Sequence, residues 1–93
     1  MNSIRQNDPK IMVVGLGYVG LPLAIALARK FSVTGFDVNQ ARINELTSGN
    51  DRTGEISTEE LAHSSIKFID DINEGVPSDV YVIAVPTPID HEN

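Results

Sequence analysis

Three glycines in the pattern Gly15-x-Gly17-x-x-Gly20 follow an apolar run, Ile11 to Val14, and open a segment rich in leucine and alanine. In a strand-to-helix turn of this kind the first glycine permits the tight turn, and the second lets a phosphate approach the main chain. The third lets the helix pack closely on the strand. Amides at the helix start then face the anion. The pattern favours a dinucleotide site over a turn whose glycines serve packing alone.

An aspartate lies at the position where a dinucleotide site requires an acidic residue. Asp37 ends the apolar segment Phe31 to Phe36 and follows Gly20 at close to the usual spacing of about 20 residues. Its carboxylate is expected to accept both ribose hydroxyls and to repel a 2′-phosphate, which favours NAD over NADP. An alternative and compatible role is to help Asn39 cap the next helix.

Two further side chains are candidates for the same ligand. Arg42, on the first turn of the helix after Asp37, is expected to lie over the adenine or reach its ribose. The alternative is an exposed helix arginine, and a cation at this place keeps NADP open. Thr87, in the run from Val85 to Pro88, follows a strongly apolar strand and falls at the sheet edge where ligands bind. The alternative for Thr87 is a hydroxyl facing solvent in a proline-rich turn.

Strands and helices alternate along the chain. Strands are predicted over 11–14, 31–36, 66–69 and 80–85, and helices over about 18–30, from Asn39 to a stop at Gly49, and from a capping box at Ser57 to Glu60 through His63. The link 70–79 is predicted to be a turn with at most one helical turn. This order predicts an α/β fold, a partial Rossmann fold whose parallel sheet has about four strands in the order 3-2-1-4.

Both longer helices are expected on the same face of this sheet, with the 70–79 link too short to cover the other. The central strands are expected to be buried on both faces, because they are apolar at adjacent positions. We therefore expect residues 10–93 to be the N-terminal part of a longer NAD-binding domain or to self-associate as a homo-oligomer. Residues 1–9 are predicted to be a disordered leader.

Composition limits the remaining possibilities. The chain has 93 residues, of which 41% are hydrophobic, enough for one small domain. Its net charge of -6 disfavours nucleic acid and anionic membranes. It has no cysteine, and its two histidines stand apart, so no metal site is predicted. No signal peptide or membrane-spanning run is evident, and a cytoplasmic location is expected.

Three segments resemble the UDP-glucose/GDP-mannose dehydrogenase family from about Lys10 to the C-terminus: the stretch 15–23, the stretch 35–39 with Arg42, and the stretch 85–89. The Asp51 to Glu55 loop and the Pro-Thr-Pro-Ile ending look most like the branch that acts on UDP-N-acetylhexosamines or their uronates, including enzymes of Vi-type capsule and O-antigen synthesis. The resemblance implies oxidation of a sugar C6 alcohol to a carboxylate, with two NAD consumed.

By the same resemblance, the loop amides around Tyr18 and Val19 would meet the pyrophosphate, Asp37 and Arg42 the adenosine ribose, and Thr87 the nicotinamide side. The family's catalytic cysteine, lysine and asparagine and its sugar-nucleotide domain have no counterpart here. No catalytic residue is therefore assigned, and a UDP-sugar would be bound only through the missing C-terminal part. The 93 residues alone are expected to bind NAD weakly at best and to catalyse nothing.

The sequence is also compatible with two other functional hypotheses. The chain is compatible with a free-standing NAD-binding or regulatory module without catalysis. It is also compatible with another dehydrogenase that shares the glycine loop, such as a 6-phosphogluconate or hydroxyacid type, although Pro86-Thr-Pro88 favours the nucleotide-sugar family.

Overall fold

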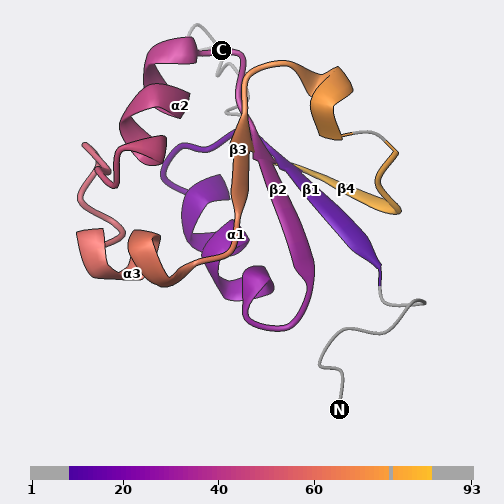
Figure 1. Cartoon of the computed structure of the whole chain (residues 1–93), viewed down its shortest axis with the longest axis horizontal. Helices are drawn as coiled ribbons and strands as arrows, with labels where there is room; N and C mark the ends of the chain where they lie inside the picture. The colour runs from indigo at the N-terminus through magenta and orange to yellow at the C-terminus, as the bar shows by residue number, and fades with distance from the viewer. Residues whose placement is uncertain (1–8, 76, 85–93) are drawn as a thin grey trace, which may run out of the picture.

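A computed structural model describes residues 9–75 and 77–84, and its centre is a four-stranded sheet with helices packed beside it (Figure 1). The strands pair in parallel in the order β3-β2-β1-β4, as the sequence predicts. Along the chain the elements are β1 (Lys10–Val14), α1 (Gly20–Ala28), β2 (Ser32–Phe36), α2 (Gln40–Thr47), α3 (Thr58–His63), β3 (Lys67–Ile69), the 3-10 helix η1 (Ile72–Gly75) and β4 (Val80–Ile83).

The ends of the helices follow from local sequence. The Asn39 side chain accepts a hydrogen bond from the Arg42 amide at 3.2 Å, which caps α2 as predicted. Gly49 ends that helix with φ +91, a conformation that glycine adopts without strain. The capping box of α3 is also present, since the Glu60 amide donates to Ser57 Oγ at 3.1 Å and the Ser57 amide donates to Glu60 Oε1 at 3.3 Å.

Helix α1 is shorter than predicted. It begins at Gly20 rather than near Tyr18, because the residues before it form the turn of the glycine loop. It ends at Ala28 rather than Lys30, because the amides of Arg29 and Lys30 bond to carbonyls three residues back, which tightens the last turn.

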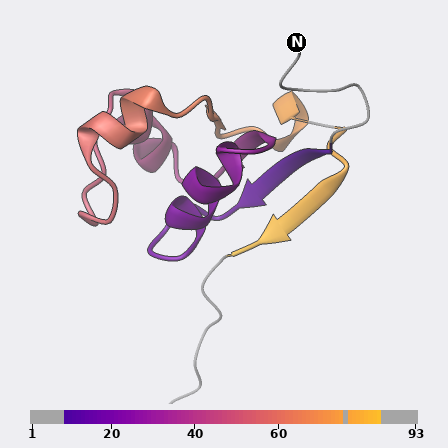
Figure 2. The ribbon, with the colours of Figure 1, turned by 90° about the horizontal axis from the view of Figure 1, so that it is seen from below.

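The core has two sides, and β1 is buried on both, as its apolar run predicts. Ile11 and Val13 pack with the helices, whereas Met12 joins a smaller cluster with Phe36 and Ile69 on the opposite face. Met12 and Val13 are fully buried. Figure 2 shows α1, α2 and α3 together on one face of the sheet.

The expectation that the second face lacks cover is wrong around Met12. Helix η1 lies over it, so closely that a Cβ on Gly75 would stand 2.5 Å from Met12 Cε and 3.0 Å from Ile69 Cδ1. The absence of a side chain at Gly75 lets a short link pack where a longer helix was thought necessary. Strand β4 differs, since Val80 is 43% exposed and Ile83 64% exposed.

The carboxyl ends of the four strands are joined by three hydrogen bonds, each donated by the residue that follows β1, β2 or β4 to the last carbonyl of a neighbouring strand. Gly15 N donates to Phe36 O at 2.8 Å, Asp37 N to Ile69 O at 3.2 Å and Ala84 N to Val14 O at 2.7 Å. The start of the glycine loop and Asp37 are therefore neighbours at one edge of the sheet.

Among the described residues, no helix has the length and apolar character needed to cross a bilayer.

The substitution Gly20→Ala is expected to destabilise the fold. A Cβ at this position would overlap the carbonyl oxygen of Gly15 and stand 2.8 Å from its carbon, and neither backbone segment is free to move. We expect urea unfolding to show a loss of about 2 kcal/mol or more. Gly17→Ala is the control, because nothing lies within 4 Å of its Cβ position. Equal losses in the two variants would contradict close packing at Gly20.

Candidate functional site

In the glycine loop, Tyr18 and Val19 are exposed and Gly17 is half-buried, whereas Gly15, Leu16 and Gly20 are buried. Gly15 has φ +99, the positive value that the tight turn requires. Among the described residues, the amides of Gly17, Tyr18, Val19 and Gly20 have no hydrogen-bond acceptor, and no side chain caps α1. The space beside Gly17 is open. This arrangement offers several donors at a positive helix end to an anion that can approach closely.

Tyr18 and Val19 stand at the start of α1 with their side chains 71% and 68% exposed. Their amides, rather than their side chains, are the groups that suit a pyrophosphate. Thr87 lies outside the described residues, so its expected place near the nicotinamide side stays a prediction.

Asp37 is fixed by two main-chain amides. Its Oδ2 accepts from Leu16 N at 2.9 Å and its Oδ1 from Asn39 N at 2.9 Å. Asp37 therefore also has the alternative role considered from the sequence, since it holds Asn39, the residue that caps α2. A carboxylate has about four acceptor positions, so capacity for ribose hydroxyls remains. The bond to Leu16 also ties the carboxylate to the glycine loop.

Arg42 is buried, with 7% of the residue exposed, so the picture of an exposed helix arginine is wrong. Its Nε donates to Leu16 O at 2.6 Å, and its Nη1 donates to Glu45 Oε2 at 2.8 Å and Asp51 Oδ1 at 2.9 Å. The remaining nitrogen, Nη2, is buried and has no partner among the described residues. Contact with the cofactor stays a prediction for this side chain.

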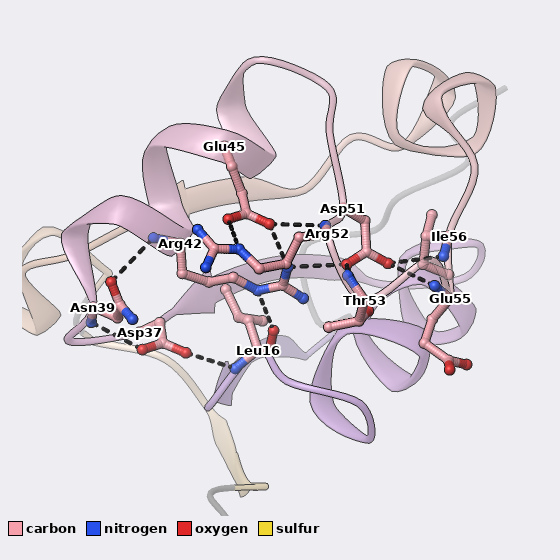
Figure 3. A network of polar contacts seen from close by, with 10 residues as sticks. All are labelled: Leu16, Asp37, Asn39, Arg42, Glu45, Asp51, Arg52, Thr53, Glu55 and Ile56. Carbon is pink, nitrogen blue, oxygen red and sulfur yellow. Dashed lines mark hydrogen bonds and ion pairs between the residues drawn. The ribbon is translucent and has the colours of Figure 1, made fainter.

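Asp51 is the centre of a loop that sequence reasoning did not place at the site (Figure 3). Its side chain has no exposed surface, and besides Arg42 it accepts from Thr53 Oγ1 at 2.6 Å and from the amides of Glu55 and Ile56 at 2.9 Å each. An aspartate two residues before a threonine signals a local turn. Nothing in the sequence indicates the bond to Arg42.

Glu45 joins the two arginines of this region. Its Oε2 accepts from Arg42 Nη1 at 2.8 Å, and its Oε1 accepts from Arg52 Nε at 2.7 Å. The Arg52 amide also donates to Oε2 at 2.9 Å. This main-chain bond, with those from the two guanidinium groups, holds the pKa of Glu45 below its usual value, although desolvation opposes the shift.

A pocket of about 190 Å³ lies beside the glycine loop. Its wall includes Arg42, Arg52 and Asp37, the residue predicted to bind the ribose. The residues that line it are Leu16, Gly17, Asp37, Asn39, Arg42, Arg52 and Thr53. A nucleoside fits these groups, because a carboxylate is present for hydroxyls and the buried, unpartnered nitrogen of Arg42 lacks an acceptor. Two larger pockets lie against α3, away from the loop.

No group of three or more histidine, cysteine, aspartate or glutamate side chains within residues 9–75 and 77–84 is arranged to hold a metal ion.

The substitution Asp51→Asn is expected to lower stability in a pH-dependent way. Burial raises the pKa of Asp51, but hydrogen bonds from Thr53, Ile56 and Arg42 outweigh it and hold the pKa at about 2, below the ordinary 3.8. The ionised form therefore stabilises the fold above pH 4, and this stabilisation is lost as pH falls from about 4 to about 2.

Urea unfolding at pH 7 is expected to show a deficit of about 2 kcal/mol for Asp51→Asn, which shrinks as the pH approaches 2. The matched control is Asp70→Asn, at an exposed aspartate. A deficit that did not change with pH would contradict the ionic role of Asp51.

Comparison with known proteins agrees with this geometry. Residues 9–93 match the model of the UDP-glucose/GDP-mannose dehydrogenase family, NAD binding domain. The chain is 48% identical over 84 residues to UDP-N-acetyl-D-glucosamine 6-dehydrogenase of Pseudomonas aeruginosa, and 46% identical over 83 residues to protein CapL of Staphylococcus aureus. Each alignment covers 89% of this chain and 20% of the relative, so the chain spans about a fifth of the length of these curated relatives.

Among solved structures, the UDP-glucose dehydrogenase of Pyrobaculum islandicum superposes with a TM-score of 0.72 at 28% identity, over 91% of this chain and 22% of the other. The family match over nearly the whole chain, the matching fold and the glycine loop at the sheet edge lead to one assignment. The chain belongs to the UDP-glucose/GDP-mannose dehydrogenase family, and its residues 9–93 match the NAD-binding domain of that family.

Proposed function

We propose that this chain binds NAD between the glycine loop and the pocket beside it, as the cofactor-binding part of a nucleotide-sugar 6-dehydrogenase. One observation carries the proposal. The amides of the glycine loop that lack a described partner lie next to a carboxylate that two main-chain amides hold in place. The first group suits a pyrophosphate and the second suits a ribose.

Different residues bind different parts of the cofactor. The amides from Gly17 to Gly20 hold the pyrophosphate, and Gly15 supplies the tight turn that precedes them. Asp37 accepts the hydroxyls of the adenosine ribose, and Arg42 forms the pocket wall, with Nη2 as its free donor. Thr87 serves the nicotinamide side. When bound, NAD accepts a hydride from the carbon that carries the alcohol.

The substrate we propose for the whole enzyme is a UDP-N-acetylhexosamine, oxidised at C6 to the uronate for polysaccharide synthesis. The support is the 48% identity to a UDP-N-acetyl-D-glucosamine 6-dehydrogenase. We propose that the nucleophile and the sugar site belong to parts of the protein beyond these 93 residues, since the chain has no cysteine. We further propose a cytoplasmic homo-oligomer, with exposed β4 residues such as Ile83 covered in the full protein.

The substitution Asp37→Ala tests the ribose role. NAD affinity measured by calorimetry is expected to fall by at least about tenfold, because hydrogen bonds from two hydroxyls to a charged acceptor are lost. NADP should lose less, since the repulsion of its 2′-phosphate disappears at the same time. Asp37→Asn, which keeps one acceptor oxygen, serves as an intermediate variant. Unchanged NAD affinity in Asp37→Ala would contradict the role.

The substitution Gly17→Ala tests the approach of the pyrophosphate. Its Cβ enters open space, so unfolding in urea should change by no more than about 0.5 kcal/mol. The added methyl group would occupy the path of the phosphate, and NAD affinity should fall by about tenfold or more. Normal NAD binding by a stable Gly17→Ala variant would show that the pyrophosphate does not approach at this point.

A further inference from the structure

Two arginines line the pocket beside the glycine loop, although the fold positions an aspartate there to favour NAD. Arg42 and Arg52 both contribute to the wall of this pocket, as does Asp37. Arginine binds phosphate through paired, charge-assisted hydrogen bonds. Two free guanidinium groups in this pocket would therefore favour the 2′-phosphate of NADP.

Both guanidinium groups take part in ion pairs, Arg42 through Nη1 and Arg52 through Nε. Figure 3 shows the Glu45 carboxylate between them, with one oxygen bonded to Arg42 Nη1 at 2.8 Å and the other to Arg52 Nε at 2.7 Å. Asp51 supplies a second anion to Arg42. Glu45 is only 14% exposed in its side chain and does not line the pocket, so it acts through the arginines rather than on a ligand.

We propose that Glu45 is a specificity-determining positioning residue, which keeps both pocket arginines in ion pairs and so denies a 2′-phosphate its cations. The inference rests on the proposed NAD site. Asp37 repels the 2′-phosphate directly, whereas Glu45 removes the attraction that would otherwise compensate. Discrimination against NADP thus has two separable sources.

The two arginines respond differently to the loss of this carboxylate. Arg42 keeps its bonds to Leu16 O and to Asp51, so its place in the fold is retained. Arg52 has a side chain that is 70% exposed, and its one ion pair within the described residues is to Glu45. Arg52 is therefore the group that becomes available to a phosphate.

The substitution Glu45→Gln tests the proposal, because glutamine keeps the shape and one acceptor oxygen but removes the charge. Dissociation constants for NAD and NADP are measured by calorimetry on the whole wild-type protein and on the same protein with Glu45→Gln. We expect the ratio of NADP to NAD affinity to rise by about tenfold. A general loss of stability would lower the affinity for both cofactors and leave this ratio unchanged.

Two companion variants sharpen the result. Glu55→Gln removes one negative charge from the loop that carries Asp51 and Arg52, and the Glu55 side chain is exposed and points away from the network in Figure 3. The ratio of NADP to NAD affinity in Glu55→Gln should equal that of the wild type. Adding Arg52→Ala to Glu45→Gln should cancel the gain in NADP affinity.

The outcomes separate the two proposals. An unchanged ratio in Glu45→Gln, or an equal rise in Glu55→Gln, overturns the role of Glu45 while NAD binding by the wild type upholds the cofactor site. A gain that survives Arg52→Ala overturns the proposed route through Arg52. A whole wild-type protein that binds neither cofactor overturns the proposed site itself, and the role of Glu45 with it.

Discussion

The buried guanidinium group of Arg42 joins three segments that are separate in the sequence. It donates to Leu16 O in the glycine loop, to Glu45 on its own helix and to Asp51 in the loop after α2. A buried cation is costly unless it is paired and hydrogen-bonded, so these acceptors must stay in place while the fold exists. The position of the glycine loop against the pocket follows from that requirement.

Asp37 provides the second tie between the sheet edge and the glycine loop. Leu16 is held at both ends of its main chain, since its amide donates to Asp37 and its carbonyl accepts from Arg42. A loop fixed in this way presents its remaining amides in one arrangement before any ligand arrives. Such preorganisation reduces the ordering cost of binding an anion.

The charges around the pocket are nearly balanced within the network. Glu45 and Asp51 pair with Arg42 and Arg52, which leaves Asp37 as the carboxylate that faces the pocket without a cationic partner among the described residues. The two arginines of the pocket wall therefore also take part in ion pairs within the fold. The electrostatic character of the site depends on which ion pairs form, and the number of charged residues alone does not give it.

The sequence by itself determined the sheet order, the glycine turn, the caps at Asn39 and Ser57 and the place of Asp37. Each of these depends on contacts between near neighbours or on the buried pattern of a strand. Only the tertiary structure decided that Arg42 is buried, that Asp51 and Glu45 support the site and that η1 covers Met12. These features require segments distant in the chain to meet, and the pairing of side chains across loops has no periodicity that a sequence can display.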